Sequence, residues 1–179
     1  MAGALTYRGR RAVQIENDTI RVTMLAEGGH IAEILHKPTG VNPLWTPPWP
    51  SIEPSTYRLS THPEYGNDAE SKLLAGIMGH NVCIDVFGGV SPEEAAAGMT
   101  VHGDASVMPY SIAVIDHQIV ASAALRNSRL HFERRIRLAD DGRSVLISES
   151  VENLSNWDRP IAWTQHVTLG PPFLEKGIT

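Results

Sequence analysis

The sequence predicts an all-β protein whose strands pair mainly antiparallel in a sandwich. Most patterned segments alternate apolar and polar residues with period two, as strands with one buried face do. Two such segments flank an Asp-Gly turn signal, which is typical of a hairpin. Only one short segment carries clear helix start and stop signals. Together these features favour stacked antiparallel sheets over a helical or mixed fold.

The first strands are predicted near the N-terminus. Residues 13–15 and 20–24 alternate, and Asn17-Asp18 between them offers a turn. Further strands are predicted at 31–35, 111–115 and 120–125, the last more weakly because alanine has little preference for strands.

The segment from Leu130 to Val151 predicts a β-hairpin. Asp141-Gly142 suits a two-residue type I′ loop, in which both positions take positive φ. Closing the hairpin there pairs Leu138 with Val145, Ile136 with Ile147, and Phe132 with Val151. The same register places Arg134 opposite Glu149 on the apolar face. We expect a cross-strand ion pair, or a bulge that turns both groups outward.

A short helix and a long loop complete the prediction. Ser91 is a suitable N-cap, with Pro92 at the first helical position, Glu94 closing a capping box and Gly98 ending the helix. Six prolines between residues 43 and 63 exclude a central strand there and predict a long loop. Its Trp45 and Trp49 either anchor the loop or stack on a sugar, and anchoring is the simpler interpretation.

Length and composition predict one domain, residues 1–179, and narrow the function. A net charge of −5 argues against a nucleic-acid partner, and three lysines make no basic membrane patch. A single cysteine, Cys83, excludes an internal disulfide and a cysteine-rich zinc site. No apolar run is long enough to cross a membrane, and the start lacks the apolar region of a signal peptide. We therefore expect a soluble, cytoplasmic protein.

No phosphate-binding, dinucleotide-binding, metalloprotease or serine-hydrolase motif occurs, so no cofactor is expected. Three of the eight histidines have unusual settings. His80 follows Gly79 within an otherwise apolar run, where its ring needs a polar partner. His102 precedes Gly103, which permits close approach of a backbone or ligand. The spacing of the three histidines is not that of a zinc site, so no metal is expected.

The third of these, His166, lies in a predicted strand. Trp163, Val167 and Leu169 share one face, whereas His166 shares the other with small or polar residues. If that surface is concave, the imidazole is able to act as a hydrogen-bonding acid toward a polar ligand. A solvent-facing strand histidine explains the spacing equally well.

At these segments the sequence resembles the aldose 1-epimerase (galactose mutarotase) superfamily, whose members are large antiparallel β-sandwiches that bind a hexose on one sheet. The similar segments are GHN at 79–81, VHGD at 101–104 and VENLSNWDRPIAWTQHVTLG at 151–170. Their order and rough spacing agree over about two-thirds of the chain. The opening segment MLAEGGHIAEILHKPTGVNPLW also resembles the start of the family's fold.

The resemblance implies roles for individual residues. His166 would be the acid that protonates the sugar's ring oxygen, and His102 would hydrogen-bond the sugar near that oxygen. His80 would replace a substrate-binding arginine, and Asn81 and Asp104 would complete the contacts to the sugar. The implied partner is a small-molecule sugar, and the implied reaction, interconversion of anomers, needs no cofactor.

The sequence departs from the family pattern in ways that change the expectation. His80 stands for an arginine, Asp104 for a glycine, and Val167 begins a segment that lacks the family's Tyr-Phe-Asn-Leu. The family's base, a glutamate from the C-terminal half, has no counterpart here. We therefore expect an incomplete sandwich, either part of a longer protein or completed in a homodimer, with impaired epimerase activity in this chain alone. The alternatives are a non-catalytic sugar-binding or regulatory domain and a self-associating structural half-sandwich.

Overall fold

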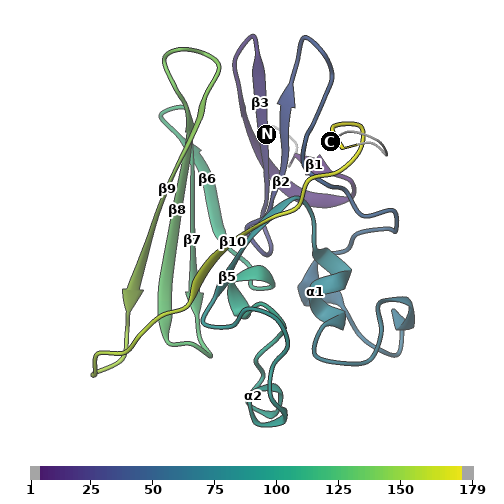
Figure 1. Ribbon diagram of the computed structural model, residues 1–179, viewed down its shortest axis with the longest axis vertical. Coiled ribbons are helices and arrows are strands. Elements are labelled where there is room, and N and C mark those ends of the chain that lie inside the picture. Colours follow the sequence, from purple (N-terminus) through teal and green to yellow (C-terminus); the bar gives the residue numbers. More distant parts are fainter. Residues whose placement is uncertain (1–4, 175–179) are drawn as a thin grey trace.

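The computed structural model describes residues 5–174 and shows a two-layered β-sandwich (Figure 1). A six-stranded sheet has the order β1-β2-β3-β4-β5-β10, and a four-stranded sheet has the order β6-β7-β8-β9. All paired strands are antiparallel, and the described part of the chain contains no helix long and apolar enough to cross a membrane. The prediction of an all-β antiparallel sandwich is confirmed.

The six-stranded sheet begins with the predicted N-terminal strands. Its members are β1 (Thr6–Tyr7), β2 (Arg10–Glu16), β3 (Ile20–Leu25), β4 (Ile31–His36), β5 (His80–Ile84) and β10 (Trp163–Val167). The turn between β2 and β3 forms because the Asn17 side chain accepts hydrogen bonds from the amides of Thr19 and Ile20. One residue pair, Ile31 with His80, joins β4 to β5, so β5 and β10 form a distinct two-stranded end of the sheet.

The four-stranded sheet contains β6 (Ser111–Ile115), β7 (Gln118–Leu125), β8 (Leu130–Leu138) and β9 (Val145–Asn153). The β8–β9 register is the predicted one, including Arg134 opposite Glu149. The predicted type I′ turn is wrong. Gly142 has a positive φ but Asp141 does not, and the amide of Gly142 donates to the carbonyl of Ala139. The loop is longer because the Asp141 carboxylate accepts from the amides of Arg143 and Ser144.

The core lies between the sheets. Its buried members come from both layers, and they include Val22, Met24, Ile84, Leu130 and Phe132. Burial of such side chains stabilises the sandwich because each removes apolar surface from water, at about 25 cal/mol per Å².

The long connections hold the remaining elements. Residues 43–63 form the predicted loop, which includes the 3₁₀ turn η1 (Pro54–Thr56), and η2 (Pro63–Tyr65) follows. Helix α1 (Ser71–Gly76), which the sequence did not predict, packs beside them (Figure 1). Helix α2 (Pro92–Ala96) has the predicted capping box between Ser91 and Glu94, and η3 (Asp104–Ser106) precedes β6.

Candidate functional site

The strand pair β5–β10 divides the predicted site residues between two faces. In the register of this pair, His166 lies opposite Asn81, and Val167 lies opposite His80. Because successive side chains point to opposite faces of a sheet, His166 and Asn81 share one face while His80 faces the other way.

The face that holds His80 looks into the sandwich. The Nε2 atom of His80 lies 2.7 Å from Oε1 of Gln165. The same oxygen accepts a hydrogen bond from Arg134, and the Gln165 amide nitrogen donates to the Glu149 carboxylate. Burial lowers the pKa of His80 below its ordinary value, and the charge of Arg134 lowers it further. His80 therefore has the polar partner that its apolar surroundings required, and that partner, Gln165, is an exposed residue of the edge strand β10.

Arg134 is the centre of that interior network. Its side chain is fully buried, and its guanidinium contacts the Glu149 carboxylate at 2.6 Å and donates to the carbonyl of Gly29 at 2.9 Å. The predicted cross-strand ion pair is therefore present, and it points inward rather than toward solvent.

The opposite face brings His102 and His166 together. Their ring centroids are 4.8 Å apart, and Phe87 stacks on His102 at 5.3 Å and lies 6.3 Å from His166. Both histidines are partly exposed and Phe87 is 62% exposed. Residues far apart in the sequence thus form one accessible aromatic cluster of two imidazoles and a phenyl ring, which we call the histidine pair site.

The backbone around His102 fixes this arrangement. His102 has φ = 66° and Gly103 has φ = 78°. Gly103 also lies so close to β5 that a side chain at this position would clash with the carbonyl oxygen of Ile84. The Nδ1 atom of His102 accepts a hydrogen bond from the amide of Gly88 at 3.1 Å. A neutral His102 ring therefore carries its proton on Nε2, which makes Nε2 a hydrogen-bond donor.

The electrostatics of the site favour a neutral His102. Burial lowers the pKa of His102 below its ordinary value, and a positive charge on His166 lowers it further. Both effects favour the neutral form of the His102 ring. The arrangement offers a neutral N–H donor beside a second ring that can carry and transfer a proton.

Asn81 and Asp104 lie near the pair but are buried. The Asn81 amide donates to Ser106 at 2.9 Å beneath the surface. The Asp104 carboxylate accepts from the amide of Asn127 at 3.0 Å and from the hydroxyl of Ser128 at 3.2 Å. In this structure both side chains support the surrounding loops, and only His102 and His166 of the five predicted residues form an exposed pair.

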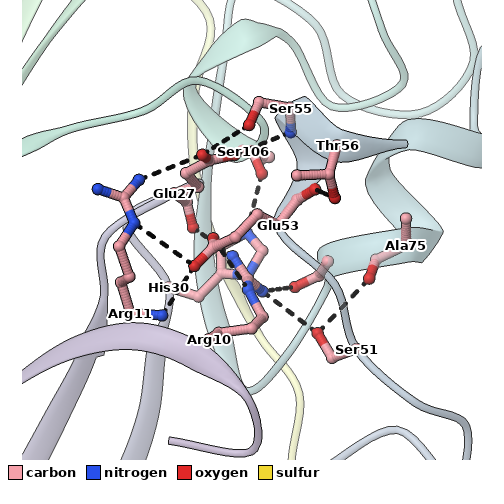
Figure 2. Close-up of polar contacts among 11 residues, drawn as sticks. Arg10, Arg11, Glu27, His30, Ser51, Glu53, Ser55, Thr56, Ala75 and Ser106 are labelled. Carbon is pink, nitrogen blue, oxygen red and sulfur yellow. Dashed lines mark hydrogen bonds and ion pairs between the residues drawn. The ribbon is translucent and has the colours of Figure 1, made fainter. Parts of the chain in front are cut away.

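A second polar cluster, which the sequence did not reveal, surrounds Arg10 (Figure 2). The buried Arg10 guanidinium donates to the carbonyls of Glu27 and Gly76 and contacts Glu53. The Glu27 carboxylate accepts from both the amide and the hydroxyl of Ser55, at 2.8 and 2.7 Å. These contacts fasten the proline-rich loop to the sheet, so the cluster is structural. Nothing in the sequence around Arg10 indicated that this charged side chain would be buried.

His30 lies at the base of this cluster (Figure 2). Its Nε2 atom is 2.9 Å from the carbonyl oxygen of Ser106, to which it donates. Burial, together with the positive charge of Arg10, lowers the pKa of His30 to about 3. His30 is therefore a neutral core residue. The described residues contain no cluster of three or more metal-ligating side chains.

No protein-family model matches the sequence, and no curated protein is significantly similar to it. The architecture is a β-sandwich of the galactose mutarotase-like type. The structure is similar to that of a galactose mutarotase-like protein from Lactobacillus casei, with 12% identity and a TM-score of 0.51 over 79% of this chain. This chain spans 44% of that one, and at such identity the likeness shows the fold alone.

A 4-alpha-glucanotransferase from Thermococcus litoralis is a more distant match, with 19% identity and a TM-score of 0.44. The similarity covers 80% of this chain and 22% of that one, and it carries no argument about function.

Proposed function

We propose that this chain is a sugar-binding protein of the aldose 1-epimerase type, with the histidine pair site as its ligand site. The observation that carries the proposal is the accessible contact between His102 and His166, at 4.8 Å between ring centroids. A loop and a strand far apart in sequence supply the two rings. The fold, a sandwich of the galactose mutarotase-like type, supports the same interpretation.

The chemistry of anomer interconversion suits this pair. The sugar ring opens when a proton reaches the ring oxygen, the bond from that oxygen to C1 breaks, and a base takes the proton of the C1 hydroxyl. His166 supplies the first proton, and the Nε2–H of His102 hydrogen-bonds the ring oxygen and stabilises the developing charge. General acid catalysis of this kind contributes about 10²–10⁴-fold to a rate.

In this proposal the pair lacks a base for the C1 hydroxyl. Among residues 5–174, the side-chain hydrogen bonds of His102 and His166 join them to the amide of Gly88 and the hydroxyl of Thr168, and no carboxylate takes part. We therefore propose that this chain alone binds a sugar and interconverts its anomers slowly or not at all. Asn81 and Asp104 act in this proposal as supports of the site, and His80 as part of the interior network.

Calorimetry and proton NMR on freshly dissolved α-glucose and α-galactose test the proposal together. We expect binding that His166→Ala weakens at least about tenfold, the effect of losing one good polar contact, with anomer conversion near the buffer rate. His117→Asn is a matched control, because His117 is exposed and lies outside the site. Sugar affinities that are equal in the unaltered chain and in His166→Ala would refute the site, and rapid mutarotation would refute the claim of inactivity.

A further inference from the structure

A cavity of about 700 Å³ opens at the end of the sandwich near the last residues of β5. It lies among the loop that carries α2, the β7–β8 turn and the β9–β10 connection, which meet at one end of the molecule (Figure 1). Among the residues that line it are Asp85, Ser155, Trp157, Arg159 and Ala162.

The charges of the cavity lining balance in number, because Asp85 and Glu94 carry negative charges and Arg129 and Arg159 positive ones. The Arg159 guanidinium binds both carboxylate oxygens of Asp85, at 3.0 and 2.7 Å, and donates to the carbonyl of Ser128 at 2.5 Å. The Arg129 guanidinium lies over the Trp157 ring, 5.3 Å from its centre. With Arg159 paired in this way, the cavity does not resemble an anion site. The bidentate pair also fixes the walls, because it links the loop after β5 to both neighbouring turns.

The lining suits a neutral, polyhydroxylated ring. Trp157 is 56% exposed, and the ring face that Arg129 does not cover offers a flat apolar surface for the C–H face of a pyranose. The Asp85 carboxylate, which Arg159 binds, and the Ser155 hydroxyl, which donates within its own turn, keep lone pairs that can accept further hydrogen bonds. An apolar platform with a few polar groups is the usual composition of a small-molecule site.

The cavity lies at the end of the β5–β10 strand pair, and His166 of the histidine pair site lies further along β10. In the β5–β10 ladder, His166 lies opposite Asn81 and Thr164 lies opposite Cys83. Beyond the ladder, the amide of Asp85 donates to the carbonyl of Ala162 at 2.8 Å. Four residues of extended chain separate His166 from Ala162, or about 13 Å. One sugar ring cannot reach across this distance, whereas a short oligosaccharide can.

We propose that the cavity binds a further sugar residue of an oligosaccharide whose reducing end lies at the histidine pair site. This inference rests on the proposed function and adds the substrate class: a neutral oligosaccharide rather than a free monosaccharide. Trp157 is its main contact residue.

The test is calorimetry of the complete chain with glucose, galactose, lactose, maltose and maltotriose. We expect at least one oligosaccharide to bind about tenfold more tightly than its monosaccharide, as burial of one ring face on an indole would provide. Trp157→Ala is expected to reduce that affinity to the monosaccharide's level. Phe173→Ala is the control, because Phe173 is also an exposed aromatic residue, at 47%, and lies outside the cavity lining.

The outcomes separate this inference from the proposed function. One outcome is that monosaccharide binding requires His166 but oligosaccharides bind no more tightly than monosaccharides. That result would overturn the oligosaccharide site and leave the proposed function intact. Oligosaccharide binding that depends on Trp157 but persists in His166→Ala would support the cavity and overturn the histidine pair site. Absence of binding by all five sugars would overturn both.

Discussion

Arg134 is a fully buried cation whose charge is balanced by Glu149, itself only 8% exposed at the side chain. Removing one partner of a buried pair leaves the other charge without compensation, which typically costs about 3–5 kcal/mol. We expect Arg134→Met to lower the free energy of unfolding by about that amount in urea denaturation.

Arg135 provides the control for this prediction. It lies next in β8, is 52% exposed and pairs with Glu133 at the surface. An exposed pair of this kind contributes about 0–1 kcal/mol, so Arg135→Met should be nearly neutral. Equal losses of stability in the two variants would contradict the buried network.

His30 makes stability depend on pH. Its pKa is lowered to about 3 in the folded chain from an ordinary 6.5. Between these values the unfolded chain binds a proton that the folded chain does not, so stability falls as the pH falls through this range. The slope is up to about 1.4 kcal/mol per pH unit.

We expect His30→Gln to remove that part of the slope between pH 6.5 and 4, measured by urea denaturation at each pH. Glutamine can still donate to the carbonyl of Ser106. At pH 7.5 His30 is neutral in both the folded and the unfolded chain, so a measurement there gives the change in the free energy of unfolding that the substitution itself causes. An unchanged slope in the variant would show that His30 titrates normally.

At the scale of elements, the loop between β5 and η3 positions the histidine pair. Gly103 combines a positive φ with close backbone contact, whereas Gly89 in the same loop has neither. We expect Gly103→Ala to weaken sugar binding markedly and to cost about 1–3 kcal/mol of stability, because both strain and displacement of the loop follow. Gly89→Ala should change neither quantity. Full sugar affinity in Gly103→Ala, measured by calorimetry, would show that this loop does not position the site.

The elements also show what local sequence can predict. The position of the Asp-Gly turn together with alternation was sufficient for the β8–β9 register, and the capping box was sufficient for α2, because both depend on neighbouring residues. The turn type was wrong because the Asp141 side chain stabilises a longer loop. Helix α1 was missed because its N-cap makes no side-chain hydrogen bond and its formation depends on packing against the proline-rich loop.

The site was only partly predictable for the same physical reason. Strand parity correctly separated His166 from Trp163 and Val167. The contact with His102 depends on a long loop, and periodicity contains no information about it; the family resemblance suggested it. The buried positions of Arg10 and Glu27 were unpredictable because their partners are mostly backbone groups of distant segments.

At the scale of the whole molecule, β10 forms an exposed apolar edge. Within the described chain it pairs only with β5, and Trp163, Val167 and Leu169 on one side are 43%, 52% and 41% exposed. Unpaired apolar edges recruit further strands. We propose that a second copy of this chain covers this edge in a homodimer.

Sedimentation equilibrium over a range of protein concentrations tests the dimer. We expect concentration-dependent association that Val167→Lys weakens, because a charge on the edge opposes strand pairing. Exposed Val114 lies on the other sheet, so Val114→Lys is the control. A strict monomer at all concentrations would contradict the homodimer.

At this scale the sandwich is proposed to bind a sugar at the contact between His102 and His166. NMR of chain labelled at the histidine rings, titrated with maltotriose and with galactose, tests it most directly. We predict that the ring signals of His102 and His166 shift together along one saturating curve while that of exposed His117 stays in place. Ring signals of His102 and His166 that remain unmoved at saturating sugar, or that move no more than that of His117, would contradict it.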